Sequence, residues 1–336
     1  MTSEKSKTCP VAAPDRKRTP YTQARHPDTA RNMTERTLPD RHETGLIEYG
    51  RHLAAELHDA GRFRTAEAYT SALNSLEKFR HGAEIPFTAV RRHLMTAYES
   101  HLKARNLCRN TTSFYMRNLR AIYNRAADEG LIAQCHPFRH VYTGTDKTVK
   151  RAVTIPVIRR IKEADLTGCP HLQLARDLFL LSFYTRGTSF IDLCHLRTTD
   201  LRNGTLSYRR RKTGQLIRMR WEACMQDIVR TYHQPESNFM LPILGNGQDS
   251  YRRYRNAEHT VNHNLRKLGL MLGLPLPLTM YVARHSWASA AQSRKIPVSI
   301  ISEGMGHESE KTTRIYLASL GMNAVDRANR DILRAL

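Results

Sequence analysis

Apolar residues recur at helical spacing through residues 43–145, and the recurrence falls into four separate runs. In the first run, Leu46, Tyr49 and Leu53 share one side of a helix. A glycine, Gly130, follows the fourth run and is suited to ending a helix. The pattern predicts four short helices that form a small all-α bundle.

Residues from about 153 to 336 are also mostly helical by pattern, with one exception. Residues 205–220 alternate in type on both sides of the turn Lys212-Thr-Gly-Gln215. Alternation around a glycine-containing turn is typical of a β-hairpin. The sequence therefore predicts a mainly α fold with a small β-sheet (α+β).

Composition divides the chain into four parts. Residues 1–41 are polar and proline-rich, which predicts a disordered basic arm, either dispensable or in contact with DNA. Residues 42–145 form the helical domain, whose outward positions are basic. Residues 146–152 are interpreted as a basic linker, and residues 153–336 as a second domain.

The net charge indicates the kind of partner. The chain has 53 Lys and Arg against 31 Asp and Glu, a formal charge of +22. Because phosphate contacts supply most non-specific nucleic-acid affinity, this excess favours DNA or RNA. A membrane surface would favour a localised lysine-rich helix, whereas the basic residues here are spread out and are mostly arginine. Neither a secretory signal nor a membrane span is recognisable, so we expect a cytoplasmic protein.

The cysteines argue against a metal centre. The six residues lie far apart without any Cys-x-x-Cys pair, which suits neither a zinc ribbon nor a disulfide framework. We therefore expect buried thiols in a reducing compartment, and neither a metal nor a cofactor. The cysteines are Cys9, Cys108, Cys135, Cys169, Cys194 and Cys224.

The most informative residues lie in the last third of the chain. The string Tyr281-Val-Ala-Arg-His285 is followed by Gly304-Met-Gly-His307 and then by Tyr316. Arg284 precedes His307 by 23 residues, and Tyr316 follows His307 by nine. We expect a helix near 283–293, a short helix after Pro297 that stops at one of the glycines, and a third helix carrying Tyr316.

This order of motifs resembles the tyrosine recombinase (phage integrase) family, and is similar to the integrases of Bacteroides-type mobile elements. The family has a His-x-x-Arg box, then Leu-Gly-His, then a nucleophilic tyrosine. Arg284 matches the box arginine, Met305-Gly306-His307 matches Leu-Gly-His, and Tyr316 lies at the family's interval. The motifs cover residues 150–336, and residues 42–145 match in character as a helical core-binding (SAM-like) domain.

Two positions depart from the family pattern. Tyr281 stands where the family usually has histidine. In the first box, Thr185-Arg-Gly-Thr-Ser-Phe-Ile-Asp-Leu193, the usual arginine position holds Ser189, and Arg186 comes three residues earlier. Because residues i and i+3 share a face of a helix, we interpret Arg186 as the substitute guanidinium. Arg176 is a less favoured candidate.

The resemblance implies metal-independent cleavage of a phosphodiester. Arg284 and Arg186 would neutralise the charge that develops on phosphorus, because guanidinium is always charged and binds phosphate with two donors. Tyr316 would attack phosphorus and remain as a 3′-phosphotyrosine. His307 would bond a non-bridging oxygen, and Lys212 would protonate the departing 5′ oxygen.

Further residues have supporting interpretations. Tyr281 either bonds the phosphate or packs against its neighbours, and Ser189 occupies the arginine position. His285 either supports the fold or donates to a residue that contacts the phosphate. Lys212 is either a solvated turn residue or a DNA contact. The expected DNA-binding residues are Arg209, Arg210, Arg211, Arg218, Arg117 and Arg120.

The resulting hypothesis is a site-specific DNA recombinase that acts as a homotetramer on paired sites, for integration and excision of a mobile element. The resemblance leaves open whether an accessory DNA-bending protein takes part. Two alternatives use the same fold: a catalytically silent DNA-binding protein, and an enzyme like a type IB topoisomerase. An RNA-binding protein is a weaker alternative, because no aromatic stacking motif is recognisable.

Overall fold

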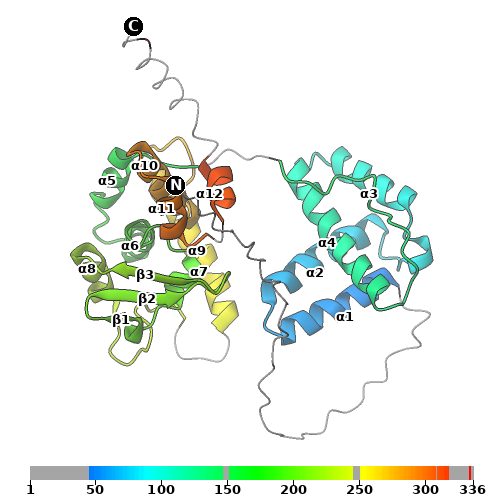
Figure 1. Cartoon of the computed structure of the whole chain (residues 1–336), viewed down its shortest axis with the longest axis horizontal. Helices are drawn as coiled ribbons and strands as arrows, with labels where there is room; N and C mark the ends of the chain where they lie inside the picture. The colour runs from blue at the N-terminus through cyan, green and yellow to red at the C-terminus, as the bar shows by residue number, and fades with distance from the viewer. Residues whose placement is uncertain (1–44, 147–150, 245–249, 308, 318–332, 334–336) are drawn as a thin grey trace, which may run out of the picture.

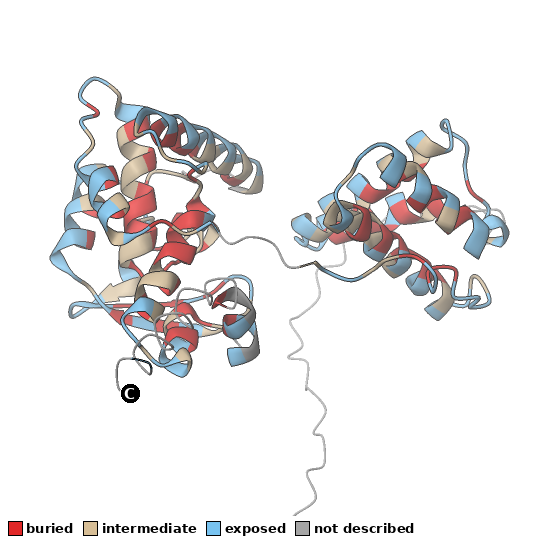
Figure 2. Ribbon diagram, turned by 90° about the horizontal axis from the view of Figure 1, so that it is seen from above, coloured by how far each residue is buried: buried red, intermediate tan, exposed pale blue. Residues whose placement is uncertain are grey.

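A computed structural model describes residues 45–146, 151–244, 250–307, 309–317 and 333, with residues 250, 311, 315 and 316 described without their side chains. The arm predicted at 1–41 and most of the linker predicted at 146–152 lie outside the described residues. Figure 1 shows that the described chain forms two bodies. Each body has a buried core of its own (Figure 2).

The first body is the helical domain. Its helices are α1 (Leu46–Asp59), α2 (Phe63–Phe79), a 3₁₀ turn η1 (Phe87–Ala89), α3 (Arg92–Ala104) and α4 (Arg109–Asp128). Gly50 allows α1 to pack closely, because a Cβ there would lie 2.8 Å from a methyl of Leu73. The fully buried side chains Leu73, Met116 and Leu119 form the centre of the core. The four predicted helices are present.

The chain that leaves α4 folds back onto the helical domain. Tyr142 N–H donates to a carboxylate oxygen of Glu99 at 2.8 Å, and Asn110 exchanges two hydrogen bonds with Asp146. The described start of the linker is therefore fixed to α3 and α4.

The second body is larger and contains the sheet. Its elements are α5 (Ile155–Lys162), α6 (Pro170–Tyr184), α7 (Phe190–Cys194), the 3₁₀ turn η2 (Thr198–Asp200), β1 (Leu201–Arg202), β2 (Thr205–Arg209), β3 (Leu216–Arg220), α8 (Ala223–Tyr232), α9 (Ser250–Met271), α10 (Met280–Ser293), α11 (Val298–Met305) and α12 (Glu310–Leu317). The strands form an antiparallel sheet in the order β1-β2-β3. The hairpin predicted at 205–220 is β2 and β3.

Side chains from the sheet and helices meet in one core. Leu206 of β2 lies opposite Met219 of β3, and both are buried with Phe179 and Leu181 of α6. A smaller apolar cluster, which includes Ala288, Ile301 and Leu317, joins α10, α11 and α12. This cluster packs α11 and the end of α12 against α10.

The two bodies touch through α2 and α9. The ring of Phe63 stacks on the ring of Tyr251 with centroids 4.4 Å apart. Arg255 Nε lies 3.3 Å from a carboxylate oxygen of Glu67. These contacts join the N-terminal ends of α2 and α9.

Three of the sequence-based expectations concern absences or burial. No described helix is both long enough and apolar enough to cross a membrane. In the same part of the chain, no three His, Cys, Asp or Glu residues form a group suited to a metal ion. The expectation of buried thiols was wrong for Cys108, Cys135 and Cys224, which are exposed, and held for Cys194.

Candidate active site

The guanidinium of Arg284 on α10 is buried and held from three sides. Its Nη1 donates to the carbonyl of Gly187 at 2.6 Å, and its Nη2 donates to the carbonyl of Met305 at 2.8 Å. Nη2 also lies 2.9 Å from His307 Nε2. Only 7% of the residue is exposed. Backbone acceptors on two separate segments therefore fix the position of this cation.

Gly187 makes the approach to Arg284 sterically possible. Its φ of 77° is in the left-handed region, which glycine adopts without strain. A Cβ at this position would lie 2.8 Å from the Cα of Arg284. This contact supplies a physical reason for the glycine in the string Thr185–Leu193.

A second arginine, Arg210, reaches the same turn from the end of β2. The turn ends α11 at Gly306, whose φ is 63°, and His307 N–H closes it on the carbonyl of Ser302 at 2.9 Å. Arg210 Nη1 donates to the carbonyl of Gly306. Its side chain is buried, with 8% of the residue exposed. Arg284 and Arg210 thus bind the carbonyls of two consecutive residues, Met305 and Gly306.

A buried carboxylate, Asp192, faces Arg210. Its Oδ2 lies 3.8 Å from Arg210 Nε and accepts the hydroxyl of Ser189 at 2.5 Å. Its Oδ1 accepts the backbone N–H of Arg211 at 2.9 Å. Ser189, which stands where the family has arginine, therefore holds the acid that faces the second arginine. The carboxylate of Asp192 therefore helps to orient Arg210.

The structure corrects the interpretation of Arg186. Helix α6 ends at Tyr184, and Arg186 has a left-handed φ of 60°, so Arg186 and Ser189 do not share a helical face. Arg186 Nη1 lies 3.4 Å from the carbonyl of Arg218, and the side chain lines a separate cavity of about 510 Å³ with Trp287. Arg210 lines the same cavity as Arg284 and His307, and Arg186 is not among the residues that line it.

The two buried arginines open onto a cavity of about 580 Å³. Its predicted site residues are Ser189, Arg210, Lys212, Tyr281, Arg284 and His307. Lys212 lies on the exposed turn between β2 and β3. Tyr281 is 58% exposed, and its ring packs edge-on against His285 with centroids 4.3 Å apart. His285 is buried behind Tyr281 and is not among the residues that line this cavity.

His307 is uncharged at neutral pH. Burial, and then the charges of Arg284, Arg210 and Lys212, lower the pKa of its ring from 6.5 to about 4. Its Nδ1 lies 2.7 Å from the hydroxyl oxygen of Thr313, a fully buried residue of α12. The sequence interpretation did not include Thr313.

Tyr316 belongs to α12, three residues after Thr313. Its side chain lies outside the part of the chain that the structure describes. The helix itself packs against α10 and α11 through Leu317, whose side chain is buried. The position of the predicted nucleophile is therefore one helical turn from a residue that contacts His307.

The arginines predicted to bind DNA have different surroundings. Arg209, Arg211 and Arg218 are exposed around the hairpin. Arg117 and Arg120 are exposed on α4, where they donate to the hydroxyls of Thr145 and Thr143, just before the linker, at 3.1 and 3.0 Å. Arg210 differs from these arginines because it is buried, with 8% of the residue exposed.

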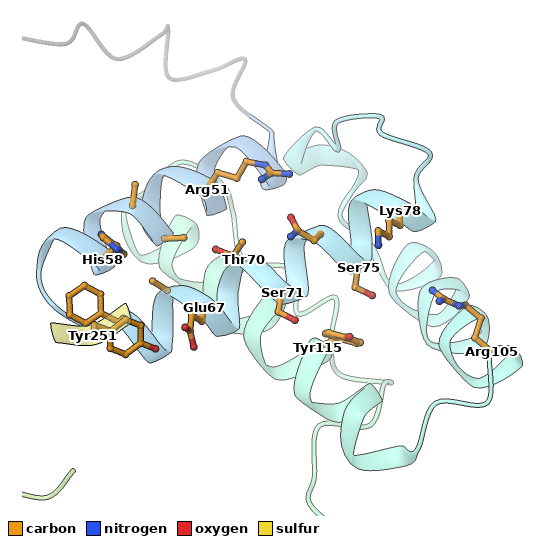
Figure 3. A pocket seen from close by; sticks show the side chains of 15 residues that line it. Arg51, His58, Glu67, Thr70, Ser71, Ser75, Lys78, Arg105, Tyr115 and Tyr251 are labelled. Carbon is orange, nitrogen blue, oxygen red and sulfur yellow. The ribbon is translucent and has the colours of Figure 1, made fainter. Parts of the chain in front are cut away.

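A further cavity, of about 820 Å³, lies along α2 of the helical domain. Figure 3 shows Thr70, Ser71 and Ser75 on this helix, with Lys78 and Arg105 at one end and Tyr251 at the other. Its polar and basic lining differs from an enclosed apolar ligand pocket. No motif in the sequence pointed to this groove.

Comparisons with known proteins cover both bodies. Residues 45–141 match the model of the phage integrase SAM-like domain, and residues 163–321 match the model of the phage integrase family. The chain belongs to the phage integrase family. The predicted family is thereby confirmed.

Among curated relatives, tyrosine recombinase XerA of Pyrococcus furiosus is 26% identical over 188 residues. The match spans 54% of this chain and 63% of the relative, which is less than two thirds of the relative's length.

Solved structures of integrases have the same fold. A lambda integrase dimer bound to a COC′ core site has a TM-score of 0.61 at 17% identity, covering 84% of this chain and 79% of that chain. The Tn1549 transposon integrase in complex with transposon right end DNA has a TM-score of 0.58 at 16% identity, with coverages of 87% and 99%. The predicted fold class, a helical domain followed by a catalytic domain with a small sheet, is confirmed.

Proposed function

We propose that this chain is a site-specific DNA recombinase that cleaves and rejoins DNA through a 3′-phosphotyrosine on Tyr316. The observation that carries the proposal is the pair of buried arginines, Arg284 and Arg210, beside a neutral His307 and the helix of Tyr316. Two fixed guanidinium groups that open onto one cavity suit a single phosphate. Arg210 takes the role that the sequence assigned to Arg186.

The cations supply most of the expected rate acceleration. Attack on a phosphodiester concentrates negative charge on the non-bridging oxygens, and donors already in position stabilise that charge without reorganising. Arg284 is held by the carbonyls of Gly187 and Met305, and Arg210 by Gly306 and Asp192. Their shared turn sets the spacing between the two groups.

The reaction exchanges one ester for another. The phenol oxygen of Tyr316 forms a bond to phosphorus while the bond from phosphorus to the 5′ oxygen breaks. Lys212, on the exposed turn that lines the cavity, protonates the departing 5′ oxygen. His307 donates to a non-bridging oxygen, the phenol proton passes to water, and Lys212 later recovers a proton from solvent. The reverse steps rejoin the strand, because the phosphotyrosine retains the energy of the broken bond.

We infer that double-stranded DNA lies between the helical core-binding domain, 42–145, and the catalytic domain, 153–336. The net charge of +22 supports a polyanionic partner. Exposed arginines of the hairpin and of α4, together with the polar groove in Figure 3, supply contacts in both domains. Tyr281 at the cavity rim is placed to contact the backbone of the bound strand.

Assembly is proposed to involve four copies on two paired sites. A solved relative in fold is described as a lambda integrase tetramer bound to a Holliday junction, with a TM-score of 0.60 at 17% identity, covering 82% of this chain and 77% of that chain. The biological reaction would be integration and excision of a mobile element, with or without an accessory DNA-bending protein.

Trapping on a nicked suicide DNA substrate tests the function. Wild type should form a protease-sensitive adduct that migrates slowly in a denaturing gel, and Tyr316→Phe should form none. Tyr69→Phe, in the helical domain, is the matched control and should form the adduct at the wild-type rate. Tight binding of wild type without any adduct would contradict the proposal and favour the silent DNA-binding protein. Strand transfer to a second duplex separates a recombinase from an enzyme that only relaxes DNA.

A further inference from the structure

The hydroxyl of Thr313, on the helix that also carries Tyr316, lies against the cluster formed by Arg284, Arg210 and His307. Thr313 is fully buried, and its Oγ1 lies 2.7 Å from His307 Nδ1. On its other side the same ring faces Arg284, with Nε2 2.9 Å from Nη2. One imidazole therefore connects α12 to the buried arginine of α10.

Hydrogen-bond chemistry determines where the ring proton lies. Arginine has only donors, so Nε2 must accept from Arg284. A neutral imidazole has one N–H, and with Nε2 accepting, that N–H is at Nδ1. Nδ1–H then donates to the oxygen of Thr313. In the DNA-free protein, Thr313 thus acts as the acceptor.

Binding of a phosphodiester requires Nε2 of His307 to donate a hydrogen bond, whereas in the DNA-free protein Nε2 accepts one. A non-bridging oxygen is only an acceptor, so a neutral His307 can contact it only if Nε2 carries the proton. Nδ1 must then accept. A hydroxyl can either donate or accept by rotating its hydrogen, and so it can satisfy Nδ1 in both states.

We propose that Thr313 is a positioning residue that allows His307 to exchange tautomers when the phosphate binds, and that fixes α12 to the phosphate site. This inference rests on the proposed function, and it concerns a residue that touches neither DNA nor the reacting atoms. Its effect is transmitted through His307, as a partner on the far nitrogen commonly orients a functional histidine.

Isosteric replacement separates the hydroxyl from the packing. Thr313→Val keeps the shape and removes the hydrogen bond, whereas Thr313→Ser keeps the hydroxyl. At saturating suicide DNA we expect Thr313→Val to lower the first-order rate of adduct formation by about 10- to 100-fold, with little change in the Kd for DNA. Thr313→Ser should stay within about threefold of wild type. Thr112→Val is the control, because this buried hydroxyl of α4 has no hydrogen-bond partner in the described structure.

A second readout does not depend on catalysis. In ring-¹⁵N-labelled full-length protein, the signals of His307 are identified by their loss in His307→Asn. Wild type without DNA should show the Nδ1–H tautomer. In the Tyr316→Phe background, which binds DNA without cleaving it, the bound protein should show the Nε2–H tautomer. Adding Thr313→Val should leave a larger Nδ1–H population in the DNA complex, whereas adding Thr313→Ser should not. If Thr313→Val does not fold, Thr313→Cys, with a weakly bonding thiol, serves in its place with a smaller effect.

The possible outcomes distinguish failure of the role of Thr313 from failure of the proposed recombinase function. An unchanged adduct rate and an unchanged tautomer in Thr313→Val would overturn the role of Thr313 while leaving the recombinase proposal intact. A slow rate that serine does not restore would also overturn it, because packing would then be responsible. If wild type forms no adduct, the proposed function fails, and the ring tautomer alone decides whether Thr313 sets the protonation of His307.

Discussion

Arginines in the two bodies of this protein differ in what holds them. Arg284 and Arg210 are buried, and each donates to backbone carbonyls of the turn at the end of α11. Arg117 and Arg120 are exposed on α4 and donate to threonine hydroxyls near the linker. A buried cation with fixed acceptors has a defined position before any ligand arrives, whereas an exposed cation can exchange its neutral partners for phosphate with little loss. The comparison predicts that the first pair governs rate and the second pair affinity.

The largest effect should come from changing the fork of a buried arginine. In Arg284→Lys, a single ammonium group cannot donate to the carbonyls of both Gly187 and Met305 and also orient a phosphate. We expect the adduct rate at saturating DNA to fall by at least about 100-fold. Arg230→Lys, on the surface of α8, should leave the rate unchanged. A rate for Arg284→Lys within threefold of wild type would break the comparison.

A methyl group on Gly187 tests the close approach that positions Arg284. Gly187→Ala places a Cβ 2.8 Å from the Cα of Arg284 at a φ of 77°. Gly168→Ala is a matched control with the same φ and no atom within 4 Å. Both variants should lose about 1 kcal/mol from backbone strain, and Gly187→Ala should lose about 1–3 kcal/mol more in urea unfolding and should slow adduct formation. Equal losses of unfolding free energy in the two variants would show that the close contact between Gly187 and Arg284 does not contribute to stability.

The neutral state of His307 predicts a pH dependence of stability. Its pKa of about 4 in the folded protein lies below 6.5, so the unfolded chain binds the proton first. Stability is therefore lost as pH falls from about 6.5 towards 4. Between pH 7 and pH 4.5, wild type should lose about 1–2 kcal/mol more than His307→Asn, a value discounted because the ring is half-buried. Urea unfolding at the two pH values measures this difference, and identical losses would contradict the assignment.

The smallest effects should come from the exposed arginines. Arg117→Ala and Arg120→Ala should each weaken DNA binding severalfold and reduce the slope of log K against log salt by about 1. The adduct rate at saturating DNA should not change. A rate loss as large as that of Arg284→Lys would show that exposed and buried arginines do not differ in role.

Local patterns were sufficient to predict much of this fold. The four helical runs of 43–145, the hairpin at 205–220 and the helix–turn–helix order around Gly306 are all present. These features depend on spacing and on turn residues within short segments, which a single sequence displays. The family motifs also brought Arg284 and His307 together, at 2.9 Å.

The helical relation that supported Arg186 as the second arginine is absent from the structure. Arg186 lies in a left-handed turn after α6, where the i, i+3 relation does not apply. A signal for Arg210 was present in the alternation of β2, since Leu206, Tyr208 and Arg210 share the inward face while Arg209 points outward. Thr313 could not be recognised, because its contact with His307 depends on how α11 and α12 pack.

The most direct test of this site compares Arg210→Lys with Arg186→Lys in single-turnover adduct formation at saturating suicide DNA. Lysine keeps the positive charge at both positions, so general DNA affinity is matched while the fork is lost, and urea unfolding of both variants controls for folding. Arg210→Lys should lower the rate by at least about 100-fold, and Arg186→Lys should stay within about threefold of wild type. A large loss with Arg186→Lys and none with Arg210→Lys would contradict the assignment and restore Arg186 as the second cation.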